Sequence, residues 1–121
     1  MWVRLPPSAP SNILREVTTF RTSHELICWL IRGFDYKSYL EIGCCDDNTF
    51  RHISVHKVGV DPVSGGTHRM TSDEYFASHD ETFDLIYIDG DHTHQQVYKD
   101  VENALVVLNR GGIIVMHDCN P

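Results

Sequence analysis

Two short apolar runs, separated by a helical pattern, constrain the fold of this chain more than any other feature. Residues 85–88 and 113–116 are continuous and apolar, and each run is followed at once by ionisable residues. Between them, residues 94–109 carry apolar side chains at spacings of three and four (Val97, Val101, Leu105 and Leu108), as in a helix with one buried face. This order predicts a β-α-β unit with buried parallel strands.

The rest of the chain extends this unit into an α/β domain. Further strand candidates lie at residues 38–42, 57–60 and 67–70. Helical patterns lie at residues 11–20, 22–33, 48–55 and 73–78; Gly33 ends the second, and a capping box from Thr71 to Glu74 opens the last. Alternating strands and helices predict a doubly wound, mainly parallel Rossmann-like sheet of about five strands, with helices on both faces.

Length and composition favour a single domain and argue against nucleic acid as its partner. Residues 1–10 are rich in proline and predict an irregular arm, which leaves residues 11–121 as a single domain. The formal net charge of −7 argues against nucleic acid as a partner, because such binding depends on clustered basic residues. No apolar stretch predicts a membrane span or a signal peptide, so we expect a cytoplasmic protein. The four cysteines form no C-x-x-C pair.

A glycine turn and an acidic strand end predict a nucleoside site. The strand at residues 38–42 turns at Gly43, and the next strand ends at Asp61. Two neighbouring parallel strands of this kind offer backbone N–H groups from the turn and a carboxylate for the two ribose hydroxyls. The alternative is a tight turn at Gly43 with a solvated, helix-capping Asp61.

Carboxylates and imidazoles cluster after the two apolar runs. Asp89, Asp91 and His92 follow the first run, and His117 and Asp118 follow the second. Ligands bind at the carboxyl ends of strands in open parallel sheets, so these residues are candidates for chemistry. An imidazole can act as a base near neutral pH, and carboxylates can hold a divalent cation. For Asp91, capping of the following helix is the alternative.

Five segments together carry a family resemblance. They are residues 40–43, 59–62, 70–74, 88–92 and 111–118. With these segments the chain resembles the class I S-adenosylmethionine-dependent methyltransferases, in particular small bacterial sugar and natural-product O-methyltransferases. The resemblance implies methyl transfer from S-adenosylmethionine to a hydroxyl group of a small molecule or sugar.

The resemblance also implies roles for particular residues. Glu41 and Gly43 would flank the methionine end of the cofactor, and Asp61 would hold its ribose. Ser72 and Asp73 would lie near the adenine, and Asp89 near the reacting methyl group. In the family loop three glycines often alternate, and here Cys45 and Asp47 occupy the second and third positions. The implied cofactor-binding set is Glu41, Gly43, Cys45, Asp61, Ser72, Asp73 and Asp89.

By the same resemblance, His92 would be the catalytic base, with Asp89 beside it. Metal-dependent relatives bind Mg²⁺ through acidic residues after the fourth and fifth strands. Carried over by position, Asp89, His117 and Asp118 would be metal ligands. A histidine in this set shifts the preference from Mg²⁺ towards Mn²⁺.

Two further strands normally follow the fifth strand in this family, and the present sequence lacks these C-terminal strands. The sequence is then a fragment or a shortened domain, or a partner completes the sheet. An open edge at the fifth strand predicts a homo-oligomer through that edge. A non-catalytic nucleoside-binding or interaction module is the main alternative function. A metal-dependent hydrolase would need a second His-rich element, and a nicotinamide enzyme would usually carry G-x-G-x-x-G.

Overall fold

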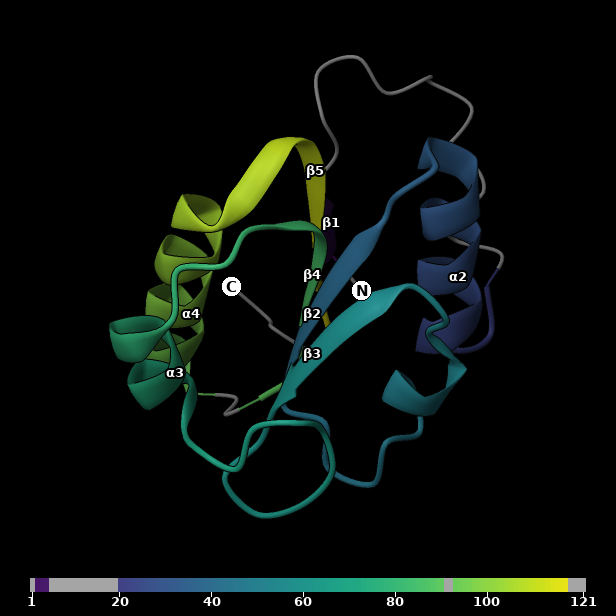
Figure 1. The fold of residues 1–121 in the computed structure, drawn as a ribbon. Helices are drawn as coiled ribbons and strands as arrows, with labels where there is room; N and C mark the ends of the chain where they lie inside the picture. The colour runs from purple at the N-terminus through teal and green to yellow at the C-terminus, as the bar shows by residue number, and fades with distance from the viewer. Residues whose placement is uncertain (1, 5–19, 91–92, 118–121) are drawn as a thin grey trace.

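The computed structural model describes residues 2–4, 20–90 and 93–117, and its centre is a five-stranded sheet in the order β1-β5-β4-β2-β3 (Figure 1). The strands are β1 (Trp2–Arg4), β2 (Ser38–Ile42), β3 (His56–Val60), β4 (Phe83–Ile88) and β5 (Leu108–Met116). β5, β4, β2 and β3 run parallel, and β1 pairs antiparallel with β5. The prediction of a mainly parallel α/β sheet is confirmed.

Helices cover both faces of the sheet (Figure 1). On one face lie α2 (Ser23–Phe34) and the short 3₁₀ helix η2 (Phe50–His52), and on the other lie α3 (Ser72–Ser78) and α4 (His94–Val106). Each face therefore has its own hydrophobic core.

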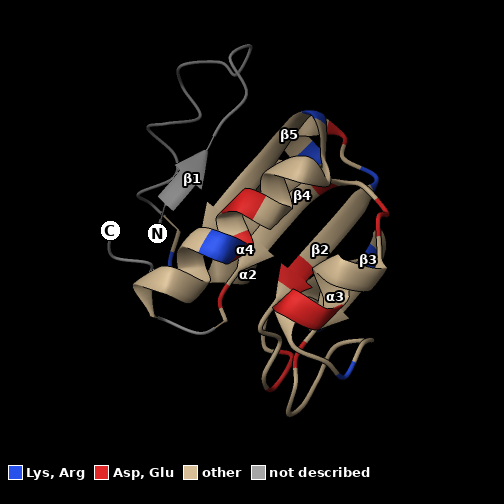
Figure 2. Cartoon of the chain, turned by 90° about the vertical axis from the view of Figure 1, so that its left-hand side faces the viewer, with Lys and Arg blue, Asp and Glu red and all other residues tan. Residues whose placement is uncertain are grey.

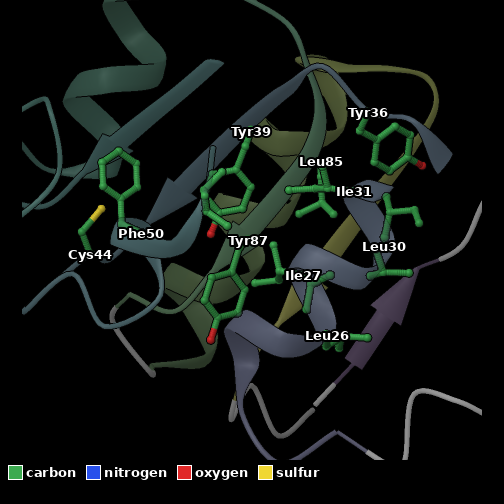
Figure 3. Packing of buried hydrophobic residues seen from close by; sticks show 13 residues of the cluster. Leu26, Ile27, Leu30, Ile31, Tyr36, Tyr39, Cys44, Phe50, Leu85 and Tyr87 are labelled. Carbon is green, nitrogen blue, oxygen red and sulfur yellow. The ribbon is translucent and has the colours of Figure 1, made fainter. Parts of the chain in front are cut away.

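The core under α2 is built from aliphatic helix residues and aromatic strand residues. Leu26, Ile27 and Leu30 recur at helical spacing and are almost fully buried. They face Tyr39 of β2 and Tyr87 of β4, as Figure 3 shows. Burying each of these side chains contributes about 1.5–3 kcal/mol, which fixes α2 against the middle of the sheet.

The face of α4 that packs against the opposite core differs from the predicted one. The helix ends at Val106 rather than at residue 109, and Leu105 of the predicted stripe is 40% exposed. The fully buried positions are Asp100 and Ala104. Asp100 accepts hydrogen bonds from Ser72 and Gln96, and these bonds allow a carboxylate to be buried at a position that the predicted apolar stripe does not include.

Local signals predicted the starts of helices better than their ends. The capping box of Thr71 and Glu74 is confirmed. The helix predicted to begin near Thr22 or Ser23 begins at Ser23, with Thr22 as its cap. α2 continues past Gly33 and ends at Phe34. Asp35, with a left-handed backbone (φ 56°), caps it by donating its N–H to carbonyl groups of the last turn. The helix predicted at residues 48–55 is only η2, because the backbone is extended again at Ile53.

Two strand predictions also need correction. Residues 67–70 form no strand, and the bridge between Val60 and His68 is all that pairs there. β5 starts at Leu108 instead of residue 113. Leu108 pairs with Phe83 and Ile113 pairs with Leu85, so residues 109–112 bulge out opposite a single residue, and Gly111 (φ 82°) lies in that bulge.

The N-terminal residues also differ from the prediction. An irregular arm is expected for residues 1–10, but Trp2–Arg4 pairs with residues 114–116 of β5. The reason is that a strand at the edge of a sheet leaves backbone N–H and C=O groups unpaired, and β1 pairs with these groups of β5. β1 thus covers a part of the edge that is expected to be open. The helix predicted at residues 11–20 lies almost wholly outside the described residues. Within the described ranges, no helix is both long and apolar enough to cross a membrane.

Candidate functional site

The carboxyl ends of β2, β4 and β3 form one rim of the sheet. Gly43, Asp89 and Asp61 follow these strands directly. The Asp89 N–H donates to the Ile42 carbonyl and the Gly43 N–H donates to the Val60 carbonyl, each over 2.8 Å. The backbone therefore holds the three predicted residues beside one another.

Gly43 touches the backbone after β4. A Cβ atom at this position would lie 2.3 Å from the Asp89 carbonyl oxygen, and the φ of Gly43 is 88°. Both the close approach and the left-handed backbone require glycine. Two adjoining clefts lie at this rim, and Gly43 and Asp89 line both of them.

The first cleft has a volume of about 610 Å³ and lies beside α3 and α4, and the second has a volume of about 510 Å³ and lies beside the start of α2. Gly43, Cys45 and Asp89 line both clefts. Of the remaining predicted cofactor residues, the first cleft has Asp61, Ser72 and Asp73, and the second has Glu41. The predicted set thus meets at one rim, but in two compartments.

Asp61 joins two loops of the first cleft. Its carboxylate accepts backbone N–H groups from Cys45 (2.9 Å), Val63 (2.8 Å) and Ser64 (2.9 Å). Although burial alone would raise the pKa of Asp61, these hydrogen bonds outweigh burial and lower it. Asp61 is therefore an anion with a fixed orientation at the wall of the cleft.

Glu41 has the opposite electrostatic environment. Its side chain is 2% exposed and accepts a hydrogen bond from the Tyr39 hydroxyl. Burial raises the pKa of Glu41 to about 7 although this hydrogen bond opposes the change, and the nearby Asp89 and Asp47 raise it further. Glu41 can therefore change its charge near neutral pH.

The loop after β2 keeps a glycine-like backbone without the glycines. Cys45 (φ 53°) and Asp47 (φ 61°) occupy the second and third glycine positions of the family loop, and both are left-handed. Asp47 accepts a hydrogen bond from the Gly66 N–H over 2.8 Å. Aspartate tolerates this conformation better than most residues, whereas for Cys45 it carries a steric cost.

The sequence did not predict two polar residues at the far end of the first cleft. Gln96 and Asp100 of α4 line it together with Ser72 and Asp73. The Ser72 hydroxyl donates to Asp100 over 2.6 Å, and the Gln96 amide donates to the same Asp100 oxygen over 3.0 Å. The available signal was the spacing of four from Gln96 through Asp100 to Ala104, which places polar groups on the buried face of the helix.

The predicted catalytic and metal residues are described only in part. Asp89 lines both clefts, and the His117 N–H donates to the Ile88 carbonyl beside it. Asp91, His92 and Asp118 lie outside the described residues. Among residues 2–4, 20–90 and 93–117, no group of three His, Cys, Asp or Glu side chains is arranged to hold a metal ion.

Comparison with known proteins identifies the family of this chain. A family model described as "Methyltransferase domain" matches residues 16–119. The chain therefore belongs to this family of methyltransferase domains. Searches of curated proteins and of solved structures found no match.

Proposed function

We propose that this protein is an S-adenosylmethionine-dependent methyltransferase that methylates a hydroxyl group of a small molecule or sugar. Membership of the methyltransferase family supports the reaction type. The observation that carries the cofactor assignment is the contact between Gly43 and Asp89, because both residues line each of two adjoining clefts that carry polar side chains. S-adenosylmethionine likewise has two polar halves, joined at the sulfonium.

In this proposal the nucleoside half takes the first cleft. Asp61 supplies a carboxylate for the ribose hydroxyls, and Ser72 and Asp73 lie at the adenine end. A volume of about 610 Å³ is within the usual range for small-molecule sites. Asp61 already accepts three backbone hydrogen bonds, but a carboxylate offers about four lone-pair sites, so one hydroxyl can still bind directly.

The methionine half takes the second cleft. Ionised Glu41 would pair with the amino group of the cofactor, since this carboxylate lines the cleft on the α2 side of Gly43. Pairing with a cation stabilises the ionised form of a carboxyl group. Bound cofactor would therefore lower the pKa of Glu41 from its value of about 7.

Methyl transfer requires in-line alignment of the acceptor oxygen with the sulfonium carbon, and removal of the acceptor proton. Asp89 lies where the two clefts meet, and so beside the expected position of the reacting methyl group. His92, three residues further along the chain, is the proposed base. The net charge of −7 supports a small acceptor rather than nucleic acid.

A divalent metal would supply a second way to lower the pKa of the acceptor hydroxyl. Asp89, His117 and Asp118 would be the residues that hold it. Asp118 lies outside the described residues, and the described residues alone contain no group of three possible ligands. Turnover that is lost in EDTA and restored by Mg²⁺ or Mn²⁺ would support the metal. Turnover that is unchanged by EDTA would leave His92 as the base without it.

Calorimetric titration of the protein with S-adenosylmethionine, S-adenosylhomocysteine and NAD tests the proposal. Binding of the first two without binding of NAD is the expected result. Binding of NAD alone would contradict the methyltransferase assignment. Binding of none of the three would favour a non-catalytic module that keeps the fold.

A further inference from the structure

The far end of the first cleft is closed by a polar network around the side-chain amide of Gln96. Its Nε2 atom lies 3.2 Å from Ser72 Oγ, 3.1 Å from Asp73 Oδ1 and 3.0 Å from Asp100 Oδ1. Asp100 is 1% exposed, so this part of the network is shielded from water. α3 and α4, which carry these residues, lie side by side in Figure 2.

The network determines the orientation of the Gln96 side-chain amide, that is, whether its nitrogen or its oxygen faces Ser72, Asp73 and Asp100. The Ser72 hydroxyl gives its hydrogen to Asp100 over 2.6 Å, so Ser72 can only accept from Gln96. Asp73 and Asp100 are also acceptors. If the amide were turned over, its oxygen would face these acceptors at the same short distances. The amide N–H groups therefore point into the network, and the Gln96 carbonyl oxygen Oε1 points away from it.

Thr71, which also lines this cleft, uses its hydroxyl hydrogen internally, because it donates to Glu74 over 3.0 Å. Lys99, which does not line the cleft, pairs with Asp73 at 3.5 Å. Among the residues that the structure describes, the Gln96 Oε1 atom accepts no hydrogen bond. The side chains thus present acceptors to this end of the cleft.

We propose that Gln96 is a specificity-determining residue that selects the exocyclic 6-amino group of the cofactor's purine, and that Asp100 is the positioning residue that holds the Gln96 amide. This inference rests on the proposed function. A 6-amino group donates hydrogen bonds and matches an acceptor. A 6-oxo group is itself an acceptor. It would face Gln96 Oε1 and the neighbouring carboxylates, which are also acceptors, and could form no hydrogen bond with them.

Binding of S-adenosylhomocysteine and of its 6-oxo counterpart, S-inosylhomocysteine, tests the selection. By calorimetry with the unaltered protein, we expect the 6-oxo compound to bind more weakly by on the order of 10- to 100-fold, the usual effect of an unmade hydrogen bond at a shielded site. Equal affinities would overturn the inference and leave the proposed function standing. Binding of neither compound would overturn both.

Variants assign the effect to particular residues. Gln96→Met keeps the length of the side chain without the amide, and we expect it to reduce the discrimination to less than about threefold. Gln95→Met is the matched control, because Gln95 is exposed and does not line the cleft. Unchanged discrimination in Gln96→Met, or an equal loss in Gln95→Met, would overturn the assignment.

The role of Asp100 is tested by a conservative and a non-conservative change. Asp100→Asn keeps an oxygen that can accept from Ser72 and Gln96, so it should retain the discrimination. Asp100→Leu removes the oxygen that accepts both hydrogen bonds and should lose the discrimination, with a smaller effect on the affinity for S-adenosylhomocysteine. Circular dichroism shows whether each variant is folded. If Asp100→Leu is unfolded, Ser72→Ala takes its place. Ser72→Ala removes one member of the network and should reduce the discrimination in part. Full discrimination in a folded Asp100→Leu, or in Ser72→Ala, would contradict the positioning role.

Discussion

Gly43 and Asp89 are in backbone contact: a Cβ atom on Gly43 would lie 2.3 Å from the Asp89 carbonyl oxygen. The neighbouring atom belongs to the main chain at the end of β4, where the Asp89 N–H is bonded to Ile42. It cannot rotate away as a side chain would. The architecture of both clefts therefore depends on the absence of a side chain at residue 43.

We predict that Gly43→Ala destabilises the protein by about 2–4 kcal/mol, from the left-handed backbone together with the steric overlap. Urea denaturation measures this change. Gly33→Ala is the control, because nothing lies within 4 Å of the Cβ position of Gly33 in α2. It should stabilise the helix by about 0.5–1 kcal/mol. If the two variants had equal stability, the argument from the contact would be wrong.

Cys45 is expected to be a strained position. Its φ of 53° favours glycine, so Cys45→Gly should raise the free energy of unfolding by about 0.5–1 kcal/mol. Cys45→Ala keeps the same backbone requirement and removes only the thiol, so its stability should stay close to that of the unaltered protein. Guanidinium denaturation of both variants separates the two causes. A stabilised Cys45→Ala would place the cost in the thiol rather than in the backbone.

Glu41 should make stability depend on pH. Burial raises its pKa from 4.5 to about 7, so the folded protein holds this proton more tightly than the unfolded chain does. The corresponding stabilisation is complete below about pH 4.5 and is lost as the pH rises through 7. The shift corresponds to about 3 kcal/mol.

The Glu41→Gln variant isolates this contribution. Glutamine can still accept from the Tyr39 hydroxyl, but it does not titrate. The stability difference between variant and unaltered protein, measured by urea denaturation from pH 4 to pH 8.5, should move in favour of the variant as the pH rises. A difference that is independent of pH would mean that Glu41 titrates normally.

His92 is predicted to act in the chemical step. His92→Ala should bind S-adenosylhomocysteine normally and lose turnover by about 100-fold or more, the usual contribution of a general base. His94→Ala is the control, since His94 is exposed in the first turn of α4. Methyl transfer from labelled S-adenosylmethionine to a panel of hydroxylated acceptors measures both. Full turnover in His92→Ala would remove its catalytic role.

Features that depend on neighbouring residues could be read from the sequence. The capping box at Thr71 and Glu74 and the cap at Thr22 use atoms within three residues of each other. The rim of the sheet could be predicted equally well, because a buried parallel strand ends where its apolar run ends, as at Asp89.

Features that depend on distant partners could not be read in this way. Asp100 looks like a surface residue until Ser72, far away in the chain, is placed beside it. The bulge in β5 is fixed by its register against Phe83 and Leu85, and no periodicity within residues 108–113 indicates that register. The left-handed backbone of Cys45 was hidden because its side chain is not one that usually marks this conformation.

The pairing of Trp2 with Met116 has a consequence for biosynthesis. β1 finds its partner only in β5, so it cannot pair until residue 116 has left the ribosome. Contacts between residues this far apart form late and slowly. During translation the nascent domain therefore presents an incomplete β-layer, and this interval is when we expect it to be most exposed to aggregation.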